Sequence, residues 1–466
     1  MDKSLYTGNE IIWFTGYMMN LNKQDADNYS TLYVTLNDPI KKQPLLSSRF
    51  VLENGLCQGV LQLPDSFPAG DYSLVAYTDH LFNHPDDAVF QQWISVRYNT
   101  SADIPFLQHF KDSSMKETVS AARAILTPDS ASYHKRSHTR WKVRLTDTAN
   151  RPVQGIFSAS CVRNTRLGGR ESEIQQYARS CFTITNLLKD TIPPFHIQVG
   201  FGNKRNLKSP ACLLIVHDNS IDIVQTEKDG SFRLSPALLK GSYGTDVIVS
   251  VVEKKYQDLY NLSIDENDQW LNKVLAKRDF PFQIQASRSD EVFTREEKEM
   301  SRAMLAPAVV KGKRKPDYLR PEYYQLPIIE GPCAAWICGC DHWKCGACPP
   351  AHSPVKGSSY LDQSTGMFVT YKGCPDDTVT KPFIKKIKAI NYPRSFKGPD
   401  FSKEYSDGEF YNTTLYWNYL IVTDKKGEAA FDFYTNDLIG HFTCIIEGVS
   451  TAGLISNRQE VTVTSE

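Results

Sequence analysis

Two features that mark whole classes of proteins are lacking from this sequence. No apolar run reaches the roughly 18–20 residues that span a bilayer as a helix, and the apolar stretch at 211–216 has about the length of one strand. Lysine plus arginine and aspartate plus glutamate each number 53, so the formal net charge is zero. A balanced chain has no global field that draws it to nucleic acid or to an anionic membrane. We therefore expect no transmembrane segment and no nucleic-acid partner.

The motifs of common enzyme classes are lacking as well. The sequence contains no Gly-x-Ser-x-Gly elbow, no His-Glu-x-x-His helix motif and no phosphate-binding P-loop. Gly200 and Gly202 are not followed by the third glycine of a dinucleotide-binding loop, and no EF-hand spacing occurs. We predict that the chain is not an enzyme and has no catalytic residues.

Short β-rich runs bounded by Gly, Pro, Asn or Asp are what the sequence does contain. In the first 98 residues such runs occur at 11–14, 32–36 and 72–77. This spacing of about 8–12 residues is typical of antiparallel sandwiches. A hydrophobic content of 41% is enough for folded cores, and 466 residues suggest several domains. The predicted fold class is all-β, with tandem immunoglobulin-like β-sandwiches and a Cys-rich insertion.

Changes in composition divide the chain into five predicted parts. The first is a sandwich at 1–98, followed by a second sandwich at 99–193 and a third at 194–287. A linker and Cys-rich insertion occupy 288–358, and a last sandwich covers 359–466. Turn signals at Asp229-Gly230 and around Gly427 predict two similar hairpins. Repetition of such a hairpin suggests repeated sandwich modules.

Six of the eleven cysteines gather in one short stretch, where we expect a stapled or metal-bound loop; they are Cys333, Cys338, Cys340, Cys345, Cys348 and Cys374. Disulfides are the favoured interpretation for an exported chain. The alternative is a structural zinc ion on Cys338, Cys340, Cys345 and Cys348, since thiolates on tight turns bind zinc. Free thiols are the third interpretation. No other cofactor is expected.

The five other cysteines are interpreted as small buried hydrophobic residues; they are Cys57, Cys161, Cys181, Cys212 and Cys444. Because the total is odd, at least one thiol is free or pairs between chains. Trp336 and Trp343 flank the cysteine cluster and form a candidate contact patch, since aromatic side chains are enriched at interfaces. His342 lies between Cys340 and Cys345, but sequence adjacency does not make a catalytic Cys–His pair.

Residues near both ends of the sequence resemble a known family. Asp2-Lys3 and Tyr6, with residues 8–14 and 70–78, resemble the MG2-type domain of bacterial α2-macroglobulin-like proteins. The match is closest to large cell-envelope proteins of Bacteroidetes. Residues 414–418, 423–427, 433–437 and 447–448 are similar to the C-terminal domain of the same group.

The resemblance implies a non-enzymatic binding or scaffold protein, with an outer-membrane transport or assembly complex as its partner. The sequence departs from the family in two ways. It has no Gly-Cys-Gly-Glu-Gln thioester, because Cys374 lies in Gly-Cys-Pro-Asp, and it has no clear plug domain. The alternative function is a non-thioester, macroglobulin-like protease inhibitor, which would need a cleavable segment at 288–330.

The expected location follows from the same features. The sequence begins Met1-Asp2-Lys3 without a signal peptide, which fits either a cytoplasmic protein or a chain whose leader has been removed. The first predicted strand starts in the middle of its run, which favours the second interpretation. We expect an extracytoplasmic protein, in the periplasm or at the outer-membrane surface.

Overall fold

The computed structural model describes residues 1–18, 31–78, 89–98, 106–109, 122–167, 195–201, 210–217, 220–252, 260–266, 282–285, 337–338, 342, 350–352, 359–362, 365–370, 384–402 and 410–465. The chain divides into two compact units, one formed by Met1–Ala303 with Lys386–Glu466 and the other by Met304–Lys385. Within the described ranges, regular structure is strand except for α3 (Pro236–Leu239) and the 3-10 turn η2 (Asn164–Arg166). The all-β prediction is confirmed. No described helix has the length and apolar character to cross a membrane.

Residues 1–98 form what we call the N-terminal sandwich. One layer joins β1, β7, β6, β3 and β4 in that order, and the other joins β2 to β5, which also pairs with the end of β4. The bounds are β1 (Leu5–Tyr6), β2 (Ile11–Tyr17), β3 (Thr31–Asp38), β4 (Gln43–Glu53), β5 (Leu56–Gln62), β6 (Gly70–Tyr77) and β7 (Phe90–Val96). Ile12, Phe14, Phe50, Leu74 and Ile94 are buried in the core between the layers.

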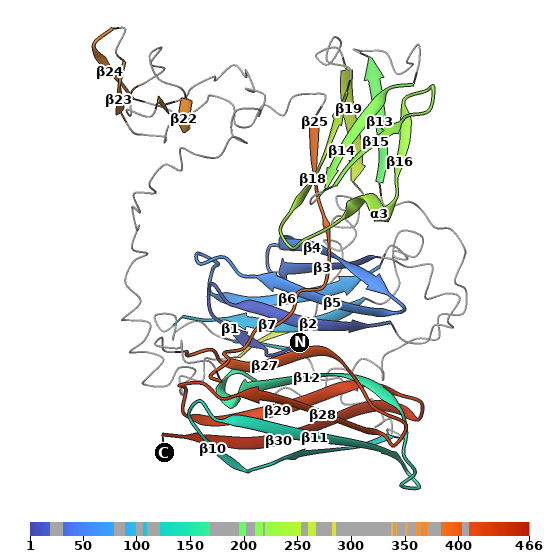
Figure 1. The fold of residues 1–466 in the computed structure, drawn as a ribbon, viewed down its shortest axis with the longest axis vertical. Coiled ribbons are helices and arrows are strands. Elements are labelled where there is room, and N and C mark those ends of the chain that lie inside the picture. Colours follow the sequence, from blue (N-terminus) through green and yellow to red (C-terminus); the bar gives the residue numbers. More distant parts are fainter. Residues whose placement is uncertain are drawn as a thin grey trace. The chain divides into compact units, whose positions relative to one another are not determined.

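A second sandwich is assembled from two blocks of sequence that lie far apart, and we call it the interleaved sandwich. Its larger sheet has the order β10, β30, β29, β12, β27, and its smaller sheet has the order β28, β11, β9. The first block supplies β9 (Ala122–Pro128), β10 (Ser132–His134), β11 (His138–Asp147) and β12 (Gly155–Arg163). The second supplies β27 (Thr414–Val422), β28 (Glu428–Tyr434), β29 (Gly440–Ser450) and β30 (Gly453–Thr464). Figure 1 shows teal strands of the first block and red strands of the second side by side within this sandwich.

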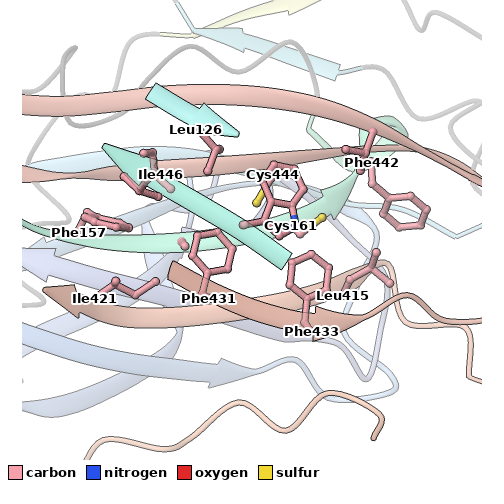
Figure 2. Packing of buried hydrophobic residues seen from close by; sticks show 14 of the residues in the cluster. Leu126, Phe157, Cys161, Leu415, Ile421, Phe431, Phe433, Phe442, Cys444 and Ile446 are labelled. Carbon is pink, nitrogen blue, oxygen red and sulfur yellow. The ribbon is translucent and has the colours of Figure 1, made fainter. Parts of the chain in front are cut away.

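This arrangement differs from the separate sandwiches expected at 99–193 and 359–466. Strand β12 lies between β29 and β27, and β11 lies between β28 and β9, so each block borders the other in both sheets. One core holds Trp141 and Phe157 of the first block together with Leu415, Phe431 and Phe442 of the second. Figure 2 shows Phe157 together with these residues of the second block. Among the described strands, neither block pairs more than two of its own, β9 with β11 in the first and β29 with β30 in the second. A two-stranded ladder is marginally stable by itself, so the two blocks complete their sheets and their core with each other.

Strand β11 shows why these sequences form half-buried strands. Thr139, Trp141, Val143 and Leu145 are buried, whereas the Arg and Lys residues between them are exposed. Successive side chains of a strand point to opposite faces, so this alternation places one apolar row in the core. Trp141 packs there in parallel with Phe431, at 6.1 Å between ring centroids. The alternation in the sequence therefore predicts both the strand and its buried face.

The hairpin turns predicted at Asp229-Gly230 and around Gly427 share one geometry. In the first turn, Glu227 donates its N–H to the Ser231 carbonyl, and Gly230 donates its N–H to the Glu227 carbonyl. In the second turn, Asp424 donates to the Glu428 carbonyl, and Gly427 donates to the Asp424 carbonyl. The fourth residue is a glycine with positive φ, 83° for Gly230 and 71° for Gly427. Glycine adopts this conformation without steric cost. The turn at Asp147–Arg151 repeats the same pattern of hydrogen bonds.

A third sandwich has a three-stranded and a four-stranded sheet. The first has the order β16, β13, β19, with bounds β13 (Phe195–Phe201), β16 (Ser231–Leu234) and β19 (Tyr260–Glu266). The second has the order β15, β14, β18, β25, with bounds β14 (Cys212–His217), β15 (Ser220–Gln225), β18 (Asp246–Val251) and β25 (Ile384–Lys388). The short strands β17 (Lys240–Gly241) and β26 (Ile390–Asn391) continue the sheet of the N-terminal sandwich beyond β4.

Four further short strands form two ladders in the second compact unit. Strand β21 (Ile337–Cys338) pairs with β22 (Pro350–His352), and β23 (Ser359–Asp362) pairs with β24 (Met367–Thr370). In the first unit, β8 (Phe106–His109) pairs with β20 (Phe282–Gln285).

Candidate functional site: a buried polar joint between two sandwiches

The predicted cysteine cluster lies mostly outside the described residues. Of its members only Cys338 is described, in β21, whose register partner in β22 is Pro350. Outside the described residues lie Cys333, Cys340, Cys345, Cys348, Cys374, Trp336 and Trp343. Disulfides, zinc binding and the tryptophan contact patch therefore stay predictions. Among the residues that the structure describes, no group of three or more His, Cys, Asp or Glu side chains could hold a metal ion.

The described residues instead place a buried polar cluster where the N-terminal sandwich meets the interleaved sandwich. We call it the joint, and it comprises Asp2, Lys3, Glu10, Thr413 and Thr414. Asp2 is fully buried, and its Oδ1 accepts hydrogen bonds from the Tyr6 hydroxyl at 2.8 Å and the Trp13 N–H at 3.1 Å. Its Oδ2 accepts a hydrogen bond from the Thr414 hydroxyl at 2.8 Å. One carboxylate thus binds groups of both sandwiches.

Lys3 extends the joint with an ion pair. Its Nζ lies 2.7 Å from Glu10 Oε1 and donates to Thr413 Oγ1 at 2.8 Å. The Thr413 hydroxyl in turn donates to Glu10 Oε1 at 3.1 Å, which closes a three-membered network. The Lys3 side chain is 3% exposed and that of Glu10 is 21% exposed. Charges removed from water to this extent depend on their partners for compensation.

The charges around Glu10 outweigh the effect of burial on its acidity. Burial alone would raise the pKa of Glu10, because it disfavours the charged form. The cations of Lys3 and Arg166, with hydrogen bonds from Lys3 and from the Thr7 N–H, lower the pKa to about 2. Glu10 is therefore a carboxylate at any physiological pH. A group so far from neutrality is a poor general acid or base, and the network is structural in character.

Apolar contacts and backbone hydrogen bonds surround the joint. Trp13 of β2 packs on Trp417 of β27 with ring centroids 5.2 Å apart, and Phe396 meets Trp13 edge-on at 5.3 Å. Ser4 donates its hydroxyl to the Leu167 carbonyl at 2.7 Å, and Tyr17 donates to the Glu447 carbonyl at 3.0 Å. The contact is thus distributed over polar and aromatic groups from both sequence blocks of the interleaved sandwich.

An open groove of about 570 Å³ lies beside β27 and β28, between these strands and the segment 395–402. Aromatic side chains line it; they include Phe396, Tyr416, Trp417, Tyr419 and Tyr434. His138 Nε2 lies 2.7 Å from Asp432 Oδ2 at its wall. Among the described residues, the hydrogen-bond partner of the His138 ring is this carboxylate.

Sequence reasoning did not identify the joint. Asp2, Lys3, Glu10 and Thr414 lie within stretches that carry the family resemblance, but none of them was predicted to belong to a site. Thr413 and Thr414 lie 410 and 412 residues away from their partners, a distance that no local pattern spans. The one available signal was an adjacent pair of opposite charges immediately before an apolar strand, since charges are almost never fully buried unless paired.

The scattered cysteines agree with their sequence-based interpretation where they are described. Cys57, Cys161 and Cys444 are buried thiols and Cys212 is partly buried, whereas Cys181 lies outside the described residues. Burial raises the pKa of the Cys57 thiol well above its usual range.

Comparisons with known proteins give no family assignment. No protein-family model matches the chain, and no curated protein matches it. Similar solved structures include Escherichia coli alpha-2-macroglobulin activated by porcine elastase, at 9% identity and a TM-score of 0.27, covering 99% of this chain and 43% of that one. A Salmonella alpha-2-macroglobulin mutant is similar at 8% identity and a TM-score of 0.27, covering 100% of this chain and 39% of that one.

The chain therefore spans about two fifths of the length of these two macroglobulins. At such TM-scores the likeness carries no argument about function. The β-sandwich fold rests on the strand pairing of the chain itself, which defines the protein as a series of β-sandwich domains.

Proposed function

We propose that the chain is a non-enzymatic scaffold and binding protein of the bacterial cell envelope. Its place is outside the cytoplasm, in the periplasm or at the outer-membrane surface of a Bacteroidetes-type envelope. Its partner is a protein complex of outer-membrane transport or assembly. The location and the partner come from the sequence resemblance, and the joint supports the scaffold role.

The observation that carries the proposal is the ionic and aromatic contact between two sandwiches. Asp2 bridges Trp13 and Thr414, and Lys3 bridges Glu10 and Thr413, within a contact in which Trp13 also packs against Trp417. Hydrogen-bonded charges have strict geometry, so they fix the orientation of the two sandwiches more tightly than apolar contact alone. A fixed spacing between domains is what a scaffold requires.

Fractionation combined with cross-linking tests this proposal. Cells that produce the full chain are separated into cytoplasm, periplasm and membranes, after cross-linking with a lysine-reactive reagent. We expect the chain in the envelope fractions, cross-linked to outer-membrane proteins identified by mass spectrometry. Recovery in the cytoplasm, or in the envelope as an uncross-linked monomer, would contradict the proposal.

The protease-inhibitor alternative depends on residues 288–330, which lie outside the described residues. It stays a prediction that limited proteolysis tests. Cleavage within 288–330, followed by compaction measured by sedimentation velocity, would favour the inhibitor. Cleavage without compaction would leave the scaffold proposal ahead.

A further inference from the structure

Cys161 and Cys444 lie directly opposite each other in the larger sheet of the interleaved sandwich. Strands β12 and β29 pair without a register shift over their whole contact, from Gly155 opposite Ser450 to Arg163 opposite Phe442. The position of the two cysteines as cross-strand partners is therefore fixed by eight flanking pairs. Both side chains are 0% exposed and belong to the same core cluster, so both point inward.

Figure 2 shows the two sulfur atoms in the same part of that core, among Leu126, Leu415 and Phe433. Burial raises the pKa of the Cys444 thiol, and the neighbouring Cys161 thiol raises it further. Thiolate is the species that reacts in thiol–disulfide exchange. In the folded sandwich both thiols are thus shielded from solvent, and the raised pKa of Cys444 disfavours its reactive thiolate.

We propose that Cys161 and Cys444 form a disulfide bond when the chain folds in an oxidising compartment. Directly opposite residues of an antiparallel pair have α-carbons about 4.5–5.5 Å apart. This lies inside the range of about 4.4–6.8 Å that disulfides span. The backbone of β12 and β29 therefore holds the two residues at bonding distance without displacement of either strand.

The bond forms by two exchange steps with a small-molecule or protein disulfide as the oxidant. The Cys161 thiolate attacks one donor sulfur, which gives a mixed disulfide and releases one donor thiol. The Cys444 thiolate then attacks the Cys161 sulfur and releases the second donor thiol. The two cysteines lose two electrons and two protons in total, and the donor disulfide is reduced to two thiols.

The burial of both thiols determines when the bond between them can form. Because both thiols are inaccessible in the folded sandwich, exchange takes place while β29 docks on β12, and the bond is inert afterwards. The bond would join the two sequence blocks of the interleaved sandwich at its centre. Its occurrence in cells rests on the extracytoplasmic location proposed above, whereas the capacity of the pair to form it does not.

Refolding under two redox conditions tests the pair. The full chain is unfolded with reductant and refolded either with reduced and oxidised glutathione or with dithiothreitol, and then alkylated in denaturant and digested with trypsin. The predicted tryptic peptides 145–163 and 427–458 each contain one cysteine, Cys161 and Cys444 respectively. We expect these peptides linked in most molecules of the glutathione sample and unlinked in the dithiothreitol sample.

Two variants sharpen the measurement. The Cys161→Ala/Cys444→Ala variant loses the linked peptides, and the difference in unfolding midpoint between its two refolded samples is smaller than in the unmodified chain. Cys57→Ala is the matched control, because Cys57 is equally buried but has Gly16 and Leu52 as its register partners. This variant keeps the link between Cys161 and Cys444.

Separate alkylation of Cys161 and Cys444 in the glutathione sample would overturn the proposal, as would linkage of either one to another cysteine. A second sample is protein taken from cells and alkylated at the moment of lysis. It distinguishes a pair that cannot form the disulfide from a chain that does not fold in an oxidising compartment. Peptides linked after refolding but unlinked in cells would contradict the oxidising location and leave the pair supported. Peptides linked both after refolding with glutathione and in protein alkylated at lysis would support the disulfide and the proposed location.

Discussion

The N-terminal sandwich and the interleaved sandwich are built from the same kind of strand, yet they close differently. In the first, every pairing among β1–β7 joins strands that lie within residues 5–96, and some of the paired strands are neighbours in sequence, such as β3 with β4 and β6 with β7. In the second, β12 lies between β29 and β27, which come more than 250 residues later. Alternation of apolar and polar residues fixes which face of a strand is buried. It does not fix which other strand covers that face.

The largest expected effect is on the folding of isolated segments. Residues 1–98 contain the buried core of the N-terminal sandwich, so we expect this fragment to fold cooperatively. Residues 122–167 and 410–465 each contribute only part of one core, so each alone should be unfolded. A fusion of the two through a short Gly/Ser linker between 163 and 413 should fold, since Val162 and Thr414 are register partners.

Circular dichroism and urea unfolding of the four polypeptides measure this difference. Cooperative unfolding of 122–167 alone would contradict the shared core. Failure of the fusion, with 1–98 folding normally, would show that the intervening chain contributes more than a connection.

Local pattern predicted the elements of this fold and not their assembly. The β11 row of Thr139, Trp141, Val143 and Leu145 and the turns at Gly230 and Gly427 follow from rules that act over a few residues. The contact of Asp2 with Thr414 follows from nothing local, because the two residues lie 412 positions apart and meet only in the folded chain. The two-block sandwich was missed for the same reason.

The next largest effect is expected at the joint. Lys3→Met removes the cation that compensates Glu10, and loss of one partner of a buried ion pair costs about 3–5 kcal/mol. Lys41→Met is the matched control within the N-terminal sandwich. The Lys41 side chain is 68% exposed and its Nζ lies 3.7 Å from Asp38, so its loss should cost less than about 1 kcal/mol.

Urea unfolding of the full chain measures both variants. Equal losses of unfolding free energy in the two variants would mean that the Lys3 pair is as weak as a surface pair. The contact between the two sandwiches would then not depend on a strong ion pair at the joint.

The smallest effect is on the pH dependence of stability. The pKa of Glu10 is lowered from 4.5 to about 2, so the folded state binds this proton less readily than the unfolded chain does. Its contribution to stability is complete above about pH 4.5 and is lost as the pH falls through about 2. Glu10→Gln has no such proton, so the stability difference between the unmodified chain and this variant should shrink from pH 5 to pH 2.

Unfolding free energies at four pH values between 5 and 2 give this difference. Glu53→Gln is the control, because the Glu53 side chain is 67% exposed and pairs with Lys240 at 3.3 Å. The difference in unfolding free energy between the Glu53→Gln variant and the unmodified chain should change little between pH 5 and pH 2. A Glu10→Gln curve parallel to that of the unmodified chain would contradict the lowered pKa.

The return of the chain at β27 has a mechanical consequence. Strand β12 ends at Arg163 and β27 begins at Thr414 beside it, so the long excursion between them starts and finishes at almost the same point of one sheet. A force that pulled Arg163 and Thr414 apart would therefore act on the β12–β27 ladder before it extended the chain between them. The domains inserted between these two residues can therefore be exchanged or lengthened over evolution while the β12–β27 ladder keeps the two ends of the insertion together.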